Sequence, residues 1–238
     1  MKDVIRIYPT PEMSASASAA FIDRTIKEVL QEKEKVSLAL SGGSTPALLF
    51  SVLAAEYADA GYWDKIKIFW VDERCVPPSD SESNFGNAAK LFLDPLKIPE
   101  ANIFRIHGES APEVEVKRYS EVLVAELGEV PQLDICLLGI GTDGHTASIF
   151  PRDIKLMQSK EIVAVATHPE SGQRRITITG KVINKSKTTV FLAHGKEKKS
   201  VLDQILNQKG REKYPAGLVL NSFEGVLWYL DTEAYRLP

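Results

Sequence analysis

Cysteine is scarce in this chain, which has 238 residues and two cysteines, Cys75 and Cys136. Two cysteines are too few for a disulfide framework, and neither belongs to a Cys-x-x-Cys pair or a Cys/His metal pattern. The four histidines also lack the spacing of zinc ligands, so the sequence predicts no metal site. A reduced, cytoplasmic protein is the expectation that follows.

A surplus of basic residues is also missing. The 29 Lys and Arg residues face 32 Asp and Glu residues, which gives a formal net charge of −3. Proteins that bind nucleic acid or a membrane surface generally carry a basic excess. We therefore expect neither a nucleic acid nor a membrane as a partner. A small anionic substrate remains compatible with this balance, because one pocket needs only a few cations.

The chain has no long, uninterrupted hydrophobic run. Residues 36–55 carry no charge, but the polar segment SGGSTP interrupts them, whereas a membrane-spanning helix would be predominantly apolar throughout. Residues 1–21 include small residues that resemble a cleavage site but no apolar stretch before them, so we expect no signal peptide. Apolar residues make up 44% of the chain, which is ordinary for a globular protein and excludes disorder.

Strand-like and helix-like patterns alternate from end to end. The predicted strands are residues 4–8, 36–40, 66–71, 133–138, 162–166, 176–179, 189–193 and 226–230. The predicted helices are residues 11 to about 30, 46–60, 85–93, 112–127 and 196–206. This alternation predicts one α/β domain over residues 1–238, with a mainly parallel sheet covered on both faces. Residues 133–138 form the most apolar strand, which we expect at the centre of the sheet.

Polar and glycine-rich residues follow three of these strands, at the positions where open α/β sheets bind ligands. The first cluster is Ser41-Gly42-Gly43-Ser44-Thr45-Pro46. Glycines let the backbone approach a ligand, and the helix that follows presents free N–H groups suited to phosphate. The segment is not a Walker loop, because no lysine follows the second glycine at the required place. The alternative is a tight strand-to-helix turn without a ligand.

The second cluster is Asp72-Glu73-Arg74, directly after the strand at residues 66–71. Three charged side chains at the end of a strand are costly unless they are exposed or used. The cluster is therefore either part of a site or a solvated ion-pair loop. We do not expect Cys75 beside it to act as a nucleophile, since no motif pairs it with a base.

The third cluster follows the central strand and contains a histidine. Gly139, Gly141 and Gly144 match the G-x-G-x-x-G pattern, which in dinucleotide-binding proteins requires an acidic residue about 20 positions later, at the end of the next strand. No acid stands there, so we expect no dinucleotide. The candidate functional group is the imidazole of His145, held among glycines beside Asp143, because histidine ordinarily titrates near neutral pH.

Two groups of cations complete the pattern. Arg174 and Arg175 stand at the entry to a strand, and Lys196, Lys198 and Lys199 stand at the start of a helix. Cations at a helix start oppose the helix dipole, so a lysine there is easier to explain if it meets an anion. For most of these lysines, the alternative is a solvent-exposed position on the helix surface.

The motifs SGGSTP, VDERCVPPSDSESN, LLGIGTDGHTASIFP, RRITIT and GKEK together resemble the 6-phosphogluconolactonase family, in the family's order and over residues 36–205. The resemblance implies a Rossmann-like, three-layer α/β/α sandwich similar to glucosamine-6-phosphate deaminase and ribose-5-phosphate isomerase. It also implies hydrolysis of 6-phospho-D-glucono-1,5-lactone to 6-phosphogluconate in the oxidative pentose phosphate pathway. No cofactor and no obligate protein partner are implied, only a sugar-phosphate substrate.

The resemblance further implies roles for the matching residues. His145 takes the position of the family's general base, with Asp72 and Arg74 as the active-site pair. Either Asp143 or Asp72 would orient the imidazole. The residues expected around the substrate are Gly42, Gly43, Ser44, Thr45, Gly144, Arg175 and Lys198. Arg174 remains an alternative to Arg175, and Lys196 and Lys199 remain alternatives to Lys198.

Two other functions fit part of the pattern. A sugar-phosphate isomerase or deaminase of the same fold would use similar glycine loops, although residues 72–88 resemble lactonases more closely. A non-catalytic sugar-phosphate sensor fits less well, because the chain has no additional DNA-binding segment and no basic surplus.

Overall fold

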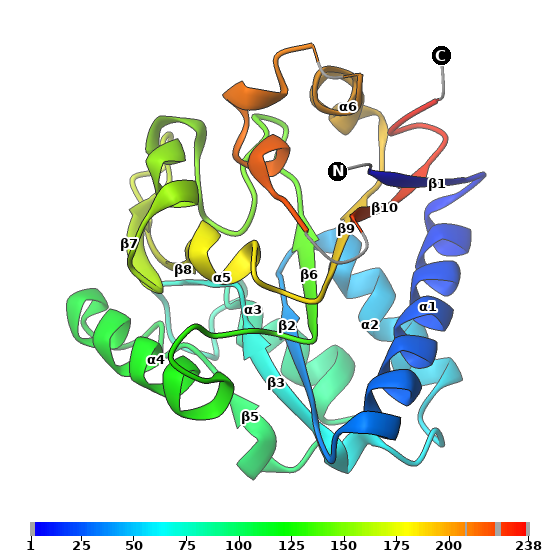
Figure 1. Ribbon diagram of the computed structural model, residues 1–238, viewed down its shortest axis with the longest axis vertical. Helices are drawn as coiled ribbons and strands as arrows, with labels where there is room; N and C mark the ends of the chain where they lie inside the picture. Colours follow the sequence, from blue (N-terminus) through cyan, green and yellow to red (C-terminus); the bar gives the residue numbers. More distant parts are fainter. Residues whose placement is uncertain (1–2, 208, 222–224, 237–238) are drawn as a thin grey trace.

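The computed structural model describes residues 3–207, 209–221 and 225–236 (Figure 1). The strands within these ranges are β1 Val4–Tyr8, β2 Val36–Leu40, β3 Ile66–Trp70, β4 Asp72–Arg74, β5 Ile103–Phe104, β6 Ile135–Gly139, β7 Val163–Thr167, β8 Arg174–Ile178, β9 Thr188–Ala193 and β10 Val226–Asp231. The α-helices are α1 Pro11–Glu32, α2 Ser44–Glu56, α3 Asn84–Ala88, α4 Pro112–Leu127, α5 Gly180–Ile183 and α6 Lys199–Leu206. A π-helical turn, Ala89–Leu93, continues α3, and short 3-10 segments cover Trp63–Lys65, Glu100–Asn102, Pro151–Gln158, Lys196–Lys198, Arg211–Lys213 and Pro215–Leu218.

Seven strands form a sheet in which all pairings are parallel, in the order β1-β10-β9-β6-β2-β3-β5. The apolar strand β6 is the fourth of the seven, so the prediction of a central strand is confirmed. Figure 1 shows α1 and α2 on one side of the central strands and α4 on the other. The predicted α/β fold with a mainly parallel sheet is therefore confirmed. Because the strands run in one direction, their carboxyl ends meet at a single edge of the sheet.

The sequence explains why the first helix begins where it does. Thr10 precedes the helix in an extended conformation, and its side chain accepts a hydrogen bond from the backbone N–H of Met13. Pro11 follows at the first helical position, where a missing N–H costs nothing. Ile22 and Ile26 are buried one turn apart and attach the helix to the sheet. The predicted start of this helix is confirmed.

A second, smaller sheet corrects the predicted architecture. Residues 72–74 form the strand β4 and not a solvated ion-pair loop, which was one of the two alternatives for this cluster. The strand β4 pairs antiparallel with one side of β8, and β7 pairs antiparallel with the other side. The predicted strands at 162–166 and 176–179 therefore belong to this antiparallel sheet and not to the parallel one. The run of charged residues suggested solvent exposure. The carboxylates of Asp72 and Glu73 are instead buried and hydrogen-bonded within the protein.

Three helix boundaries also differ from the prediction. The helix α2 begins at Ser44 instead of residue 46 and ends at Glu56, so Ser44 and Thr45 belong to its first turn. The helix predicted at 85–93 changes to a π-helical turn after Ala88. The helix predicted at 196–206 begins with the 3-10 segment Lys196–Lys198.

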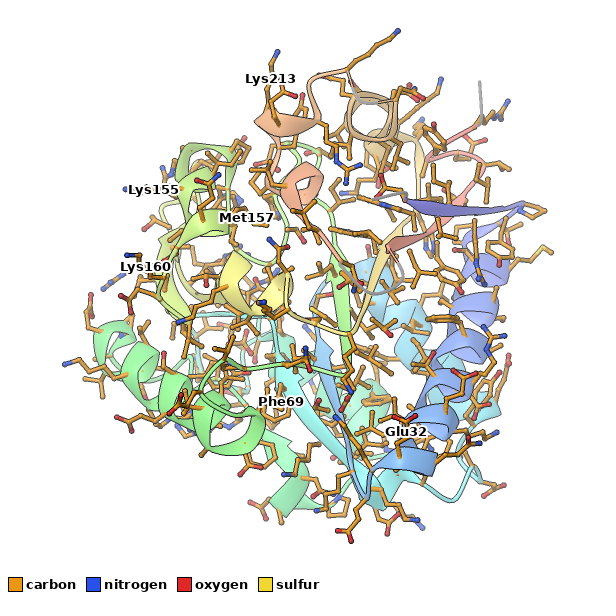
Figure 2. All side chains as sticks on the ribbon, viewed as in Figure 1. Glu32, Phe69, Lys155, Met157, Lys160 and Lys213 are labelled. Atoms are coloured by element: carbon orange, nitrogen blue, oxygen red, sulfur yellow. The ribbon has the colours of Figure 1, made fainter. Side chains whose placement is uncertain are left out.

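One hydrophobic cluster contains side chains of both sheets, including Leu38 and Phe69 of the parallel sheet and Ile176 of the antiparallel one. This shared core supports the proposal of a single domain. Figure 2 shows Phe69 within the fold, whereas Lys155 and Lys213 point away from it. None of the described helices combines the length and the apolarity that crossing a membrane requires.

Candidate active site

A cavity of about 220 Å³ lies where the carboxyl ends of β2, β6 and β9 meet the strands β4 and β8. Its wall contains nine of the residues predicted from the sequence: Gly42, Gly43, Ser44, Thr45, Asp72, Arg74, His145, Arg175 and Lys198. The remaining two predicted residues, Asp143 and Gly144, do not line the cavity but belong to the loop that carries His145. The topology thus gathers the three clusters at one edge of the sheet.

The structure separates the alternative cations. Arg175 is buried and lines the cavity, whereas Arg174 forms an ion pair with Glu113 of α4. Lys198 lines the cavity, and Lys196 and Lys199 are not part of its wall.

His145 is held by its own loop. Its Nδ1 lies 2.6 Å from Oδ1 of Asp143, which also accepts the backbone N–H of His145 at 3.1 Å. With Asp143 ionised, Nδ1 carries the proton, so Nε2 is the ring nitrogen left to receive one. Burial raises the pKa of Asp143, but the hydrogen bonds and charge of His145 outweigh it and bring the pKa below its ordinary value.

The backbone beneath the imidazole requires a glycine. A Cβ atom on Gly141 would lie 2.1 Å from Nδ1 of His145, closer than atoms can approach. Gly141 also donates its N–H to the backbone oxygen of His145 at 2.9 Å. Ala216 donates its N–H to the oxygen of Gly144 at 3.1 Å, so the segment around residue 216 supports the loop from outside.

Asp72 is buried and bonded elsewhere. Its Oδ2 accepts a hydrogen bond from Oγ of Ser148 at 2.6 Å, and its Oδ1 accepts one from Nδ2 of Asn84 at 3.3 Å. Of the two carboxylates left open by the sequence, Asp143 is therefore the one that contacts the imidazole. Asp72 instead presents a fixed negative charge to the cavity.

Two guanidinium groups face the same small cavity. Nη1 of Arg74 donates to the backbone oxygen of Glu82 at 2.7 Å, and Nε of Arg175 donates to Oε1 of Gln173 at 3.1 Å. Burial and then the charge of Arg74 lower the pKa of Arg175, although Asp72 opposes this shift. An anion bound between the two groups would relieve their mutual repulsion and compensate for their burial.

The glycine loop brings the start of α2 to the cavity. Gly43 precedes this 13-residue helix and supplies no side-chain cap, so the first N–H groups of the helix, where its dipole is positive, are available at the cavity. Gly42 is required for a different reason, since a Cβ atom there would lie 1.7 Å from Oδ1 of Asn84.

The cavity wall also contains residues that were not predicted, notably Asn84 and Glu197. Asn84 lies in a segment whose overall likeness to lactonases was noted, but nothing in its own position marked it as part of a site. Its position beside Asp72 follows from hydrogen bonds between β4 and the start of α3, which the sequence pattern did not reveal.

The structure does not favour the cysteines as nucleophiles. Cys136 is buried in β6, and this burial raises its pKa to about 12. Burial also raises the pKa of the half-buried Cys75. Within the part of the chain that the structure describes, no group of three or more His, Cys, Asp or Glu side chains is placed to hold a metal ion.

Known proteins resemble this chain over most of its length. A 6-phosphogluconolactonase of Treponema pallidum is 43% identical over 194 residues, which cover 80% of each chain. A 6-phosphogluconolactonase of Haemophilus influenzae is 40% identical over 221 residues, which cover 91% of this chain and 94% of the relative. The crystal structure of a 6-phosphogluconolactonase from Thermotoga maritima superimposes with a TM-score of 0.86 at 28% identity, over 97% of this chain and all of the other.

The profile of the family described as glucosamine-6-phosphate isomerases/6-phosphogluconolactonase matches residues 9–228. This match spans every strand at the edge where the cavity lies, and it confirms the resemblance stated from the motifs. The chain belongs to the glucosamine-6-phosphate isomerase/6-phosphogluconolactonase family.

Proposed function

We propose that this chain hydrolyses 6-phospho-D-glucono-1,5-lactone to 6-phospho-D-gluconate, with His145 as the general base. The lactone hydrolase predicted from the sequence agrees with the activity for which the curated relatives are named. The observation that carries the mechanism is the position of His145 in a cavity rich in cations, with its Nδ1 bonded to Asp143.

In this proposal the phosphate binds beside the cations of the cavity. Arg175, Lys198 and the N-terminal turn of α2 supply positive charge and N–H donors for it. Binding at this distant group fixes the lactone ring relative to the water molecule and the imidazole, so the reaction gains from positioning as well as from acid–base chemistry.

The chemical step uses one imidazole twice. Nε2 of His145 removes a proton from water as the water oxygen bonds to C1 of the lactone, and the carbonyl electrons move onto the carbonyl oxygen. When this tetrahedral intermediate collapses, the bond between C1 and the ring oxygen breaks, and the imidazolium returns its proton to that oxygen. Asp143 keeps Nε2 free of a proton beforehand and stabilises the imidazolium meanwhile. General acid–base help of this kind contributes about 10²–10⁴ in rate.

The cavity also holds groups for the charge that develops on the carbonyl oxygen. Arg74 and backbone N–H groups of the glycine loops are the donors available for this oxyanion. Asp72 lies beside these cations, balances part of their charge, and accepts hydrogen bonds from substrate hydroxyl groups with its remaining lone pairs.

A direct assay tests this function. Freshly prepared lactone is added to the protein, and acid release at constant pH is compared with spontaneous hydrolysis in buffer. We expect a large acceleration, and no ammonia from glucosamine 6-phosphate, the substrate of the rival deaminase activity. Ammonia release without faster lactone opening would assign the chain to the other branch of its family. A cytoplasmic role in the oxidative pentose phosphate pathway goes with the lactonase function.

A further inference from the structure

Glu73 is a buried carboxylate that does not line the cavity but holds the residues beside it. Its Oε1 accepts the backbone N–H groups of Arg74 at 2.7 Å and Asn84 at 2.8 Å. Its Oε2 accepts the N–H of Phe85 at 2.7 Å and Oγ of Ser83 at 3.1 Å. Glu73 is only 2% exposed, and its four donors belong to β4, to α3 or to the residue that caps α3. Glu73 thus fixes the beginning of α3 against β4.

Asn84 is the residue that this arrangement presents to the site. Its Nδ2 donates to the backbone oxygen of Asp72 at 2.9 Å and to Oδ1 of Asp72 at 3.3 Å. Its own Oδ1 lies so close to Gly42 that no side chain fits there. Asn84 is itself buried and fills the space between the Asp72 carboxylate and the glycine loop. It therefore touches two of the three clusters that form the cavity.

We propose that Asn84, held in place by Glu73, is a positioning residue that fixes the Asp72 carboxylate and its distance from the glycine loop. The proposal rests on the lactonase function stated above. Ser148 holds one oxygen of Asp72 and Asn84 holds the other, so the carboxylate has one orientation only when both donors are present.

The neutral side-chain amide of Asn84 suits a position beside the Asp72 carboxylate for an electrostatic reason. An aspartate at position 84 would set a second carboxylate against Asp72, and two like charges at hydrogen-bond distance disfavour joint ionisation. An alanine would free Oδ1 of Asp72 and leave space beside Gly42. Only a neutral donor of this length both binds Asp72 and reaches the glycine loop.

A double-mutant cycle tests whether Asn84 acts through Asp72. N84A, D72N and the double variant are compared with the wild type in kcat/KM, after subtraction of spontaneous lactone hydrolysis. We expect N84A to lose about tenfold or more in the wild-type background, since small displacements of reacting groups cost up to about 10²-fold. In the D72N background the same substitution should change kcat/KM less than about threefold, because interacting residues are not additive.

Independent effects that multiply in the double variant would overturn the proposal, as would a fall in thermal stability without a fall in kcat/KM. Asn84→Ser serves as a milder variant should N84A not fold, and the same cycle with D72N applies to it. Asn87→Ala is the matched control, because Asn87 is exposed on the same helix, bonds to the backbone of Ser81 and lies outside the cavity wall. If the wild-type protein opened no lactone, the proposed function itself would be refuted. That outcome differs from independent effects of N84A and D72N, which would refute only the positioning role of Asn84.

Discussion

Nδ1 of His145 lies 2.6 Å from Oδ1 of Asp143, two residues earlier in the same loop. The pair is local, so it depends on the conformation of the loop and not on the packing of distant elements. The other nearby carboxylate, Asp72, is held by Ser148 and Asn84. The two carboxylates therefore have different surroundings: Asp143 contacts the imidazole, and Asp72 lies in the cavity wall with the arginines.

Replacing the imidazole should remove most of the catalysis. Asn at position 145 has similar reach but cannot accept the proton of water, so His145→Asn should lower kcat by about two to four decades. Binding of 6-phosphogluconate, measured by calorimetry, should persist because the phosphate contacts lie elsewhere in the cavity. His107→Asn is the control, since His107 lies outside the cavity wall. Near-wild-type turnover in H145N, with the same pH profile, would contradict the general-base assignment.

We expect the Asp143 carboxylate to affect catalysis by setting the protonation of the His145 imidazole. Asp143→Asn offers an amide that can donate to Nδ1, which would place the ring proton on Nε2, where it blocks proton removal from water. We expect a loss of kcat of about 10²-fold or more, within the range of general-base catalysis, and little change in affinity for the product. Because His145 depresses the pKa of Asp143, the pair survives at acid pH and is lost only as pH falls through that lowered pKa. An unaltered kcat would show that the imidazole needs no partner.

The sequence was sufficient to predict the parallel sheet and the three clusters at its edge. Helical and strand periods mark the buried faces of regular elements, and the rule that parallel sheets bind ligands at carboxyl ends then brings the clusters together. Arg175 and Lys198 could not be separated from their neighbours in this way. Which of two adjacent arginines faces inward depends on the register of β8 against β4, which is a tertiary property.

The smaller sheet was missed for a related reason. Asp72 and Glu73 look like exposed loop residues because isolated buried charges are unfavourable. Asp72 instead accepts a hydrogen bond from Ser148, far along the chain, and Glu73 accepts one from Asn84, across the turn between β4 and α3. No local pattern reveals such partners, so a solvated loop remained an alternative where the protein has a largely buried strand.

Asp134, at the opposite end of the sheet, should contribute to stability in a pH-dependent way. Its Oδ1 accepts Nζ of Lys33 at 2.5 Å, and its Oδ2 accepts the N–H and the hydroxyl of Ser37 at 3.0 and 2.9 Å. Burial raises the pKa of Asp134, but these bonds outweigh it and bring the pKa below its ordinary value. A carboxyl with a depressed folded-state pKa stabilises the protein above its unfolded pKa, and this contribution is lost as pH falls through the folded pKa.

Asp134→Asn should therefore lower the free energy of unfolding by about 1–3 kcal/mol at neutral pH, measured by urea denaturation. The difference from wild type should shrink below about pH 4, where the unfolded carboxyl begins to protonate. Asp94→Asn is the control, since Asp94 is exposed. A difference that stays constant from neutral to acid pH would mean that lost packing, and not charge, accounts for the effect.

Lys198 should act on binding more than on chemistry. It lines the cavity, and in the proposed mechanism its charge meets the phosphate equally in the bound substrate and in the transition state. Removing such uniform binding raises KM and leaves kcat nearly unchanged. We expect Lys198→Ala to raise KM for the lactone about tenfold or more, as loss of a charge-assisted contact worth about 1.5–3 kcal/mol implies. Lys199→Ala, one residue on and outside the cavity wall, should leave KM within about twofold, since surface ion contacts contribute little. If the two variants behaved alike, the phosphate would have to bind through Arg175 and the glycine loop without Lys198.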